Sequence, residues 1–479
     1  MKVAFVYKQA SLSMPLGICY LSAVVKKNGF NSQFFLFKKD EDFTCLQKII
    51  RFKPDIIGYS VITGNQNAYL NFNKEVKKRI KNVVSVFGGP HITFFPEIIY
   101  EDGVDAVCMG EAEEAFLFFI RQFQEKGSMP ESSPNFWIKH LGEVSKSTVL
   151  PLITDLDLLP FPDREGFFLA NPFVKSNGRK EFNARRGCPY KCTYCFNESY
   201  NKLYLNKNIL RQRHPESICD EINYVGSKFP MKFVNFIDDV FTIKKDWLLN
   251  FCEEYAKRVK FPFSCNLRLN NVNEEIIQAL KKANCSLVYV GTESGNEYLR
   301  NKIMRRKMSI ELMLEKTELL HKYKIKILTE NIIGNHGETY DMALETLRLN
   351  QKMNPGFPGC SLFTPYPKLL LTEYAISNGY FDGDYNKISE NYFEDTSIKF
   401  KDEAEKNKML NLRCFFSLLT KFSWLEIVFL RFFINIKHNK LICLFGNFVD
   451  GYYLFKSVPY KYSAMEFIRT VRQYITLPR

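Results

Sequence analysis

Two long stretches of the sequence alternate short apolar segments with amphipathic ones, and this alternation constrains the fold more than any other feature. In residues 1–130 the strand-like segments VAFVY, QFFLF, DIIGYS, VVSVFGG and DAVCM are separated by helical patterns. This order is typical of a doubly wound parallel sheet, which binds ligands outside the carboxyl ends of its strands. We therefore expect an α/β fold whose first domain offers a ligand site at one edge of a sheet.

A second alternation follows, with the strand-like segments EFNARR, KFVNFID, FPFSCNLR, SLVYVGTE, IKILTENIIG and GCSLFTPY. Helical patterns lie between them, and one pattern places Val272, Ile276, Leu280 and Ala283 on a shared face. This number of strand and helix units predicts a partial (β/α)6 barrel in residues 179–385, rather than the full eight-stranded barrel.

The remaining segments differ from both alternations. Residues 131–178 are rich in turn formers and show no sustained periodicity, which indicates a linker. In residues 386–479 the run NLRCFFSLLTKFSWLEIVFLRFFINI is apolar, but charges interrupt it before roughly 18 uncharged residues accumulate. The interrupting residues are Arg413, Lys421, Glu426 and Arg431. We expect a mainly helical C-terminal cap on the barrel, with an interfacial helix or a wall for an apolar substrate as the alternative.

The segment ARRGCPYKCTYCFNES places Cys188, Cys192 and Cys195 in CxxxCxxC spacing directly after a predicted strand. Three thiolates can hold three irons of a [4Fe-4S] cubane and leave the fourth iron free to chelate a methionine moiety. Structural zinc normally takes four ligands, and no compact fourth Cys or His follows this loop; ordinary buried cysteines are the other alternative. The position at the end of the first barrel strand, where barrel enzymes place their sites, favours the cluster.

Charge and cysteine usage limit the compartment and the partners. The formal net charge is +14, but the densest basic stretches, 175–213 and 300–307, do not interleave aromatics as RNA-binding motifs do. A Lys-rich composition explains the charge, and nucleic acid is not an expected partner. The 13 cysteines fit a reducing compartment, and the N-terminus has no apolar signal core, so we expect a cytoplasmic protein.

Two segments of the first stretch, GGPH at 88–91 and GEAE at 110–113, precede the cysteine loop. Together with the order of sheet domain, linker and cysteine loop, they resemble the radical S-adenosylmethionine superfamily, in particular its cobalamin-binding subgroup, often called class B methylases. The resemblance covers residues 1 to about 370. It implies a [4Fe-4S] cluster, S-adenosylmethionine and cobalamin as cofactors, with a reducing partner such as flavodoxin or ferredoxin.

The resemblance also implies cosubstrate-binding roles in the barrel. The FIDD segment ends the second strand, where Asp238 or Asp239 can accept hydrogen bonds from the cosubstrate ammonium group or can cap a helix. Arg268 closes the third strand and can hold a carboxylate with two hydrogen bonds, or form only a surface ion pair. The GTESG segment resembles an element in which Glu293 binds ribose hydroxyls, although such a sequence also forms plain turns.

Two further positions are implied near the adenine. The IIGNHGET segment resembles the element whose backbone, here at Gly334, lies against adenine, although its Glu338 can simply begin the next helix. Tyr194, inside the cysteine loop, packs on adenine or on the barrel.

Cobalamin would need a slot lined by small residues at the carboxyl ends of the first sheet. Ser60 and Thr63 follow the third strand, and Gly88 and Gly89 follow the fourth, although ordinary turns also use Gly and Ser. The first domain lacks the DxHxxG sequence whose His would coordinate cobalt from below, and His91 lies elsewhere, in the GGPH turn. The resemblance therefore implies cobalamin without a histidine below the cobalt.

These features lead to one primary hypothesis and two rivals. The primary hypothesis is an enzyme that cleaves S-adenosylmethionine reductively at the cluster and uses cobalamin to methylate an unactivated carbon of a small-molecule or lipid substrate. The first rival uses the same cofactors for a rearrangement, cyclisation or oxidation, and the second is a noncatalytic cobalamin or iron–sulfur sensor, which would need no cosubstrate pocket. The 44 phenylalanines, several of them crowded near the C-terminus, favour an apolar substrate or peripheral membrane contact.

Overall fold

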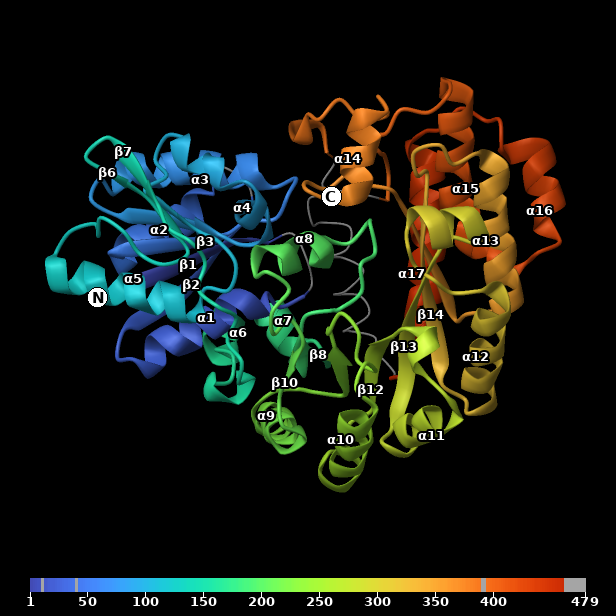
Figure 1. The fold of residues 1–479 in the computed structure, drawn as a ribbon, viewed down its shortest axis with the longest axis horizontal. Helices are drawn as coiled ribbons and strands as arrows, with labels where there is room; N and C mark the ends of the chain where they lie inside the picture. Colours follow the sequence, from blue (N-terminus) through green and yellow to red (C-terminus); the bar gives the residue numbers. More distant parts are fainter. Residues whose placement is uncertain (10–12, 39–41, 389–392, 461–479) are drawn as a thin grey trace. The chain divides into compact units, whose positions relative to one another are not determined.

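The computed structural model describes residues 1–9, 13–38, 42–388 and 393–460. The described residues form two compact units, one made of Met1–Asn177 with Tyr200–Arg211, and one made of Gly178–Ser199 with residues 212–460. In Figure 1 the first unit is mostly blue and cyan, and the second runs from green to red.

The first unit is built on a sheet with the strand order β2-β1-β3-β4-β5-β6-β7, in which β1 to β5 are parallel. These strands are β1 (Lys2–Lys8), β2 (Asn31–Phe37), β3 (Ile56–Ser60), β4 (Val84–Gly88) and β5 (Ala106–Cys108). The helices that connect or follow them are α1 (Leu16–Lys27), α2 (Phe43–Phe52), α3 (Gln66–Arg79), α4 (Pro90–Phe94) and α5 (Glu113–Lys126). The expected doubly wound parallel sheet is therefore confirmed.

Both faces of this sheet are buried. Successive residues of a strand point to opposite faces, so neighbouring residues pack into different cores. In β1, Ala4 and Val6 join a core with residues of α2 and α3, whereas Phe5 between them packs against Phe34 of β2 and Phe116 of α5. Strands covered on both faces need apolar side chains at nearly every position, and the VAFVY segment supplies them.

Part of the segment expected to be a linker extends this sheet. Strands β6 (Phe136–His140) and β7 (Glu143–Lys146) form a hairpin that pairs with β5 in antiparallel orientation. The two turn residues, Leu141 and Gly142, have φ values of 49° and 87°. Leucine is unusual in the left-handed region, where asparagine is common. The Leu-Gly pair at this turn therefore does not give the Asn-Gly signal that normally indicates a hairpin. Two short helices follow, α6 (Arg164–Ala170) and α7 (Pro172–Ser176).

The second unit contains a six-stranded parallel sheet with the order β15-β14-β13-β12-β11-β8. Its strands are β8 (Arg179–Phe182), β11 (Phe233–Phe236), β12 (Phe263–Leu267), β13 (Cys285–Glu293), β14 (Lys326–Ile333) and β15 (Phe357–Leu362). Its connecting helices are α9 (Pro215–Lys228), α10 (Lys245–Arg258), α11 (Glu274–Lys282), α12 (Ile310–Lys322) and α13 (Tyr340–Met353). The two edge strands, β8 and β15, are not paired with each other in the described sheet, so the partial barrel expected from the sequence is confirmed.

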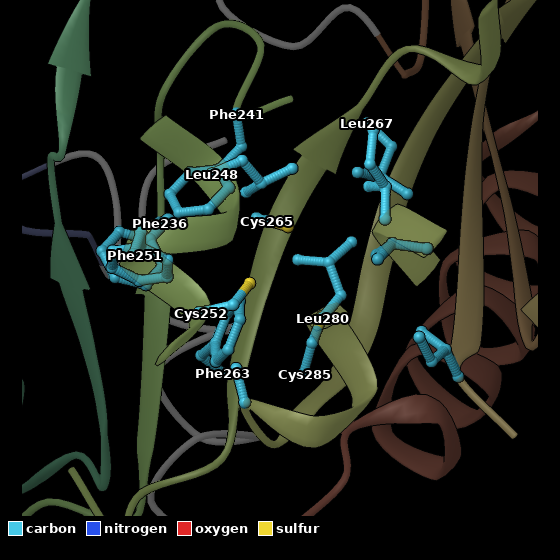
Figure 2. Close-up of a cluster of buried hydrophobic side chains, with 14 of the residues drawn as sticks. Phe236, Phe241, Leu248, Phe251, Cys252, Phe263, Cys265, Leu267, Leu280 and Cys285 are labelled. Carbon is cyan, nitrogen blue, oxygen red and sulfur yellow. The ribbon is translucent and has the colours of Figure 1, made fainter. Parts of the chain in front are cut away.

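A continuous apolar core fixes the helices onto this sheet. Figure 2 shows Phe236 and Phe263 from neighbouring strands together with Phe251 from α10. The predicted helix face is also buried, because the exposed fractions of its residues are 5% or less. Those residues are Val272, Ile276, Leu280 and Ala283. Shorter elements of the central region are β9 (Arg185–Arg186), α8 (Phe196–Leu203) and β10 (Arg211–Gln212).

The C-terminal region is helical, as expected. It contains α15 (Glu403–Lys421), α16 (Leu425–Val428), a π-helical turn (Phe429–Phe433) and α17 (Lys440–Ser457), and it is preceded by α14 (Leu370–Ser377), which lies within the range expected for the barrel. Helix α15 packs against α13, α17 and strand β15. One interrupting charge has a structural function, because buried Arg413 of α15 pairs with Asp450 of α17 at 3.0 Å. No helix within the described part of the chain combines the length and the apolar character needed to span a bilayer.

Candidate cofactor and substrate site

The cysteine loop is anchored by backbone and hydroxyl hydrogen bonds. The Thr193 N–H donates to the Met304 carbonyl at 3.2 Å, and the Thr193 hydroxyl donates to the Ile303 carbonyl at 2.7 Å. The Leu371 N–H donates in turn to the Thr193 carbonyl at 3.1 Å. The loop begins after Gly187, whose φ of 86° favours glycine. The thiols are therefore carried by a fixed segment.

The three thiols line one cavity of about 170 Å³ at the carboxyl ends of the strands of the second unit. Four further predicted residues line the same cavity: Tyr194, Asp239, Arg268 and Glu293. Their positions follow from parallel topology, since β11, β12 and β13 all end at this edge of the sheet. The sequence prediction thus brought together residues that are more than 100 positions apart along the chain.

Two predicted residues lie outside the lining of this cavity. Asp238 is 1% exposed, and its Oδ1 accepts hydrogen bonds from the backbone N–H groups of Ala184, at 2.9 Å, and Arg185. Burial raises the pKa of Asp238 to about 7. Gly334 has a φ of 73°, and a Cβ there would lie 3.2 Å from the ring of Phe400. Asp238 therefore holds the backbone just before the cysteine loop, and Asp239 is the carboxylate that reaches the cavity.

The Arg268 guanidinium lies among groups of the cysteine loop. Its Nη1 is 3.6 Å from the Cys192 Sγ, and its plane lies over the ring of Tyr190, with 3.8 Å from the central carbon to the ring centroid. Its Nε donates to Asn270 at 2.9 Å, and its Nη2 donates to the Arg306 carbonyl. A stacked and hydrogen-bonded guanidinium has a fixed orientation, which suits recognition of a carboxylate.

Sequence reasoning missed two charged residues of the cavity, Arg306 and Glu330. The Arg306 Nη2 donates to the Gly291 carbonyl at 2.7 Å and lies 3.6 Å from Glu293, while its Nη1 donates to the Tyr194 hydroxyl at 3.2 Å. Burial, and secondarily the charge of Glu293, raise the pKa of Glu330 to about 7, although its side chain is open to the cavity. The basic run at 300–307 was visible in the sequence, but nothing in it indicated that one arginine turns inward.

Gly291 permits this arrangement. A Cβ at this position would lie 2.3 Å from the Glu293 Oε1 and 2.6 Å from the Arg306 Nη2, closer than real side chains approach each other. The pairing register places Gly291 opposite Glu330 of β14, and a register shift separates Gly291 from Glu293. The absent side chain therefore leaves the space that the ion pair occupies.

The donor set of the cavity fits an iron–sulfur cluster. Burial raises the pKa of Cys188 to about 11 and that of Cys195 to about 12, so in the absence of a cation these thiols remain protonated at neutral pH. Iron would stabilise the thiolates and displace their protons. Burial also raises the pKa of Asp239, with a hydrogen bond from Asn197 opposing the shift. A cationic partner at this position would return Asp239 to its ionised form.

The first unit places its predicted residues at one sheet edge. Ser60, at the end of β3, is the register partner of Gly88, at the end of β4, and all of the predicted small residues there are half-buried. Gly89 has a φ of 98°, and a Cβ there would lie 2.7 Å from the Val61 nitrogen. The Thr63 hydroxyl lies 3.0 Å from the His91 Nδ1. The edge thus offers backbone and small polar groups, as a cofactor slot requires.

The GEAE segment is fixed at the same edge, because it follows β5. The Glu111 Oε2 accepts from the Arg211 Nη1 at 2.7 Å, and the Glu111 N–H donates to the Tyr204 hydroxyl at 2.8 Å. Gly110 is needed here, since a Cβ would lie 2.0 Å from that hydroxyl. The sequence showed the motif but not its distant partners, which lie roughly 100 residues further along the chain.

Three thiolate donors beside carboxylate and guanidinium groups, at the carboxyl edge of an incompletely closed parallel barrel, define the class of enzymes that bind S-adenosylmethionine at an iron–sulfur cluster. Residues 183–349 match the Radical SAM superfamily, and residues 5–119 match the B12 binding domain. The chain is a radical S-adenosylmethionine enzyme and belongs to the subgroup that carries a cobalamin-binding domain. Its cofactors are therefore those of both families: a [4Fe-4S] cluster, S-adenosylmethionine and cobalamin.

Individual relatives agree with this assignment. The chain is 26% identical over 371 residues to an uncharacterized methyltransferase of Pyrococcus horikoshii, covering 76% of this chain and 79% of that protein. It is also 26% identical over 370 residues to the anaerobic magnesium-protoporphyrin IX monomethyl ester cyclase of Rubrivivax gelatinosus, covering 74% and 64%. The fold resembles that of the methyltransferase TsrM from Kitasatospora setae, solved with cobalamin and a [4Fe-4S] cluster, with a TM-score of 0.63, 15% identity, and coverage of 79% and 78%.

Proposed function

We propose that this enzyme methylates an unactivated carbon of a biosynthetic small-molecule or lipid substrate, with cobalamin as the methyl carrier. The observation that carries the proposal is the single cavity shared by three thiols, two guanidinium groups and three carboxylates, in a chain that also has a B12-binding domain. The methyltransferase relative and the likeness to TsrM support methyl transfer.

In this proposal the residues of the cavity bind and orient the cosubstrate. Cys188, Cys192 and Cys195 hold the cluster, which when bound supplies the electron that cleaves S-adenosylmethionine. Asp239 accepts hydrogen bonds from the cosubstrate ammonium group, and Arg268 donates to its carboxylate. Both residues line the same cavity of about 170 Å³ as the three thiols, so they can hold the cosubstrate next to the cluster.

Glu293, Arg306 and Tyr194 form the other part of the pocket. Glu293 accepts hydrogen bonds from the ribose hydroxyls, and Arg306 holds Glu293 in position from 3.6 Å. Because Arg306 also donates to Tyr194 in the cysteine loop, it ties the ribose side of the pocket to the cluster side. Gly334 contributes backbone near the adenine.

In the first unit, Ser60, Thr63, Gly88 and Gly89 would line the slot for the cobalamin nucleotide tail. Burial lowers the pKa of His91 to about 4, and the residue is only 6% exposed. With its Nδ1 beside Thr63, His91 is part of the wall of the GGPH turn. We therefore infer that no histidine of this turn ligates the cobalt.

A second candidate function is a radical cyclisation or oxidation with the same cofactors. The relative from Rubrivivax gelatinosus favours it, because that protein is named a cyclase and is as similar in sequence as the methyltransferase. The two candidates differ in their products, since methylation consumes S-adenosylmethionine to form S-adenosylhomocysteine, whereas cyclisation does not.

The partners follow from the same proposal and from the surface of α17. The cluster requires a reducing partner such as flavodoxin or ferredoxin. Apolar side chains on one side of α17 are exposed, next to Lys440 and Lys456, which suits contact with a lipid surface or a lipid substrate. These side chains are Leu441, Leu444, Phe445, Phe448, Tyr452 and Phe455.

The test is anaerobic reconstitution with iron, sulfide, cobalamin and reductant, followed by measurement of 5′-deoxyadenosine and S-adenosylhomocysteine with candidate substrates. Matched yields of both products support methylation, and 5′-deoxyadenosine alone supports cyclisation or oxidation. Cys192→Ala should abolish the formation of 5′-deoxyadenosine. The control Cys219→Ala removes a buried thiol of α9 that packs in the apolar core, and it should leave that activity in place. If the wild-type chain forms neither product, the noncatalytic sensor remains as the hypothesis.

A further inference from the structure

A second group of metal-ligand side chains lies in the C-terminal helices, apart from the cavity of the cysteine loop. Cys414 is in the middle of α15, His438 precedes α17, and Cys443 lies in the first turn of α17. Their ligand atoms all lie within 4.8 Å of one another, and the His438 Nε2 is 3.0 Å from the Cys443 Sγ. None of the three residues lines the cavity described above.

The histidine ring is oriented by the amide of Asn411. The Asn411 Nδ2 faces the carbonyls of Ile434 and Ile436, at 3.1 and 2.7 Å, so it must be the donor end of the amide. Its Oδ1 therefore faces the His438 Nδ1, at 2.9 Å, as an acceptor. The proton of the neutral imidazole lies on Nδ1, and the lone pair of Nε2 points toward the cysteines. Metal-binding histidines are held in this way.

The backbone also brings the two helices together at this point. A Cβ on Gly446 of α17 would lie 2.7 Å from the Cys414 carbonyl and 2.8 Å from its Cα. The His438 N–H donates to Asn407 of α15 at 2.6 Å, which fixes the segment before α17. Cys443, three residues before Gly446, thus faces Cys414 across a close helix contact.

The setting suits a cation with one position open to water. Cys414 is 1% exposed, whereas His438 and Cys443 are half-buried, so the group is reached from one side. Two thiolates would neutralise a divalent ion, and the N-terminus of α17 stabilises the Cys443 thiolate. Zinc bonds of about 2.3 Å to sulfur and about 2.0–2.1 Å to nitrogen place tetrahedral ligands roughly 3.5–3.8 Å apart, within reach of small side-chain rotations.

We propose that Cys414, His438 and Cys443 bind one zinc ion, with water as the fourth ligand. Binding forms two Zn–S bonds and one Zn–N bond and releases the two thiol protons to solvent. The ion joins α15 to α17 and so fixes the C-terminal helices against strand β15.

The test uses the full chain with its cluster reconstituted, so that the loop thiols are already occupied, followed by addition of zinc and removal of the unbound ion. One zinc ion should remain bound per chain. X-ray absorption spectroscopy at the zinc edge should show two sulfur ligands together with nitrogen and oxygen ligands. Cys443→Ala and His438→Ala should each weaken zinc binding by at least about 10- to 100-fold, as even outer-shell changes do. The control Cys360→Ala, in the same apolar cluster, should leave zinc binding unchanged.

Several outcomes would overturn the proposal. Zinc retained equally by Cys443→Ala and wild type, or a zinc site without sulfur, would identify an adventitious ion only. A disulfide between Cys414 and Cys443 in anaerobically prepared protein would show that the pair is a redox couple. Because Cys192→Ala should still hold the zinc, loss of zinc in that variant would assign the ion to the cysteine loop. The result is therefore independent of the methyltransferase proposal.

Discussion

Replacing Gly291 by alanine should disable S-adenosylmethionine cleavage while leaving the fold and the cluster in place. The new Cβ would lie 2.3 Å from the Glu293 Oε1 and 2.6 Å from the Arg306 Nη2. Ordinary contact begins at 3.4 Å, so both groups must move by about 1 Å. That movement breaks the 2.7 Å hydrogen bond from Arg306 to the Gly291 carbonyl or separates Arg306 from Glu293.

The expected loss follows from this displacement. A misplacement of about 1 Å in a positioning group can reduce the rate about 100-fold, which corresponds to about 2.7 kcal/mol of activation free energy. The assay is single-turnover formation of 5′-deoxyadenosine from S-adenosylmethionine under anaerobic reduction. Iron content and the visible absorbance of the cluster should stay close to those of the wild type, because the atoms nearest to the new Cβ belong to Glu293 and Arg306 and not to the three thiols.

Gly359→Ala is the matched control. Gly359 is also a strand glycine of the same sheet with a tight contact, 3.1 Å from a new Cβ to the Thr329 carbonyl, but it does not line the cavity. It should lower stability slightly and leave cleavage per folded chain unchanged. If Gly291→Ala cleaves within about threefold of the wild-type rate, Glu293 and Arg306 do not position the cosubstrate, and the reasoning from their geometry is refuted.

The remaining predictions concern four other positions. Asp238→Ala should lower the free energy of unfolding by about 2–4 kcal/mol in chemical denaturation, because two buried N–H groups lose their acceptor, while Asp238→Asn should retain most of it. Burial raises the pKa of Glu330 to about 7 in the folded chain, against 4.5 for an unperturbed glutamate. The contribution of Glu330 to stability is therefore present below about pH 4.5 and lost as the pH rises through about 7. Glu330→Gln should flatten this part of the stability–pH curve, and an unchanged slope in the variant would contradict the prediction. His91→Ala should leave the electron paramagnetic resonance spectrum of bound cob(II)alamin unchanged, because the His91 ring is buried beside Thr63; a change in its nitrogen splitting would show that His91 ligates the cobalt. Phe448→Ser should weaken cosedimentation with anionic vesicles, whereas equal cosedimentation would show that α17 does not contact lipid.

The succession of strands and helices along the chain could be predicted from the sequence, but the pairing register between strands could not. Each strand of the barrel overlaps a predicted segment, and most of these segments are short apolar runs, as expected of parallel strands buried on both faces. The position of Glu330 in the cavity follows from its register partner Gly291, some 40 residues earlier, and no local sequence pattern contains that pairing. The hairpin at 136–146 was missed for a different reason, because its turn places Leu141 in the left-handed region.

The cavity was predicted in outline and not in detail. The spacing of the cysteines indicated the cluster, and the positions of Asp239, Arg268 and Glu293 at strand ends indicated a shared pocket. Adjacent residues at the end of a strand point in opposite directions, so the sequence could not decide between Asp238 and Asp239. Arg306 reaches the cavity from a loop, where side-chain direction follows from tertiary packing alone.

The unpaired edges of the six-stranded sheet have a consequence for how this scaffold changes its substrate range. A ring of eight strands has a fixed girth and an interior filled by its own side chains. Here β8 and β15 are not hydrogen-bonded to each other in the described sheet, so pairing between strands does not fix the width of the interior. Exchange of a segment beyond these edges could therefore admit a bulkier molecule, while the cysteine loop and the strand ends that line its cavity stay unchanged.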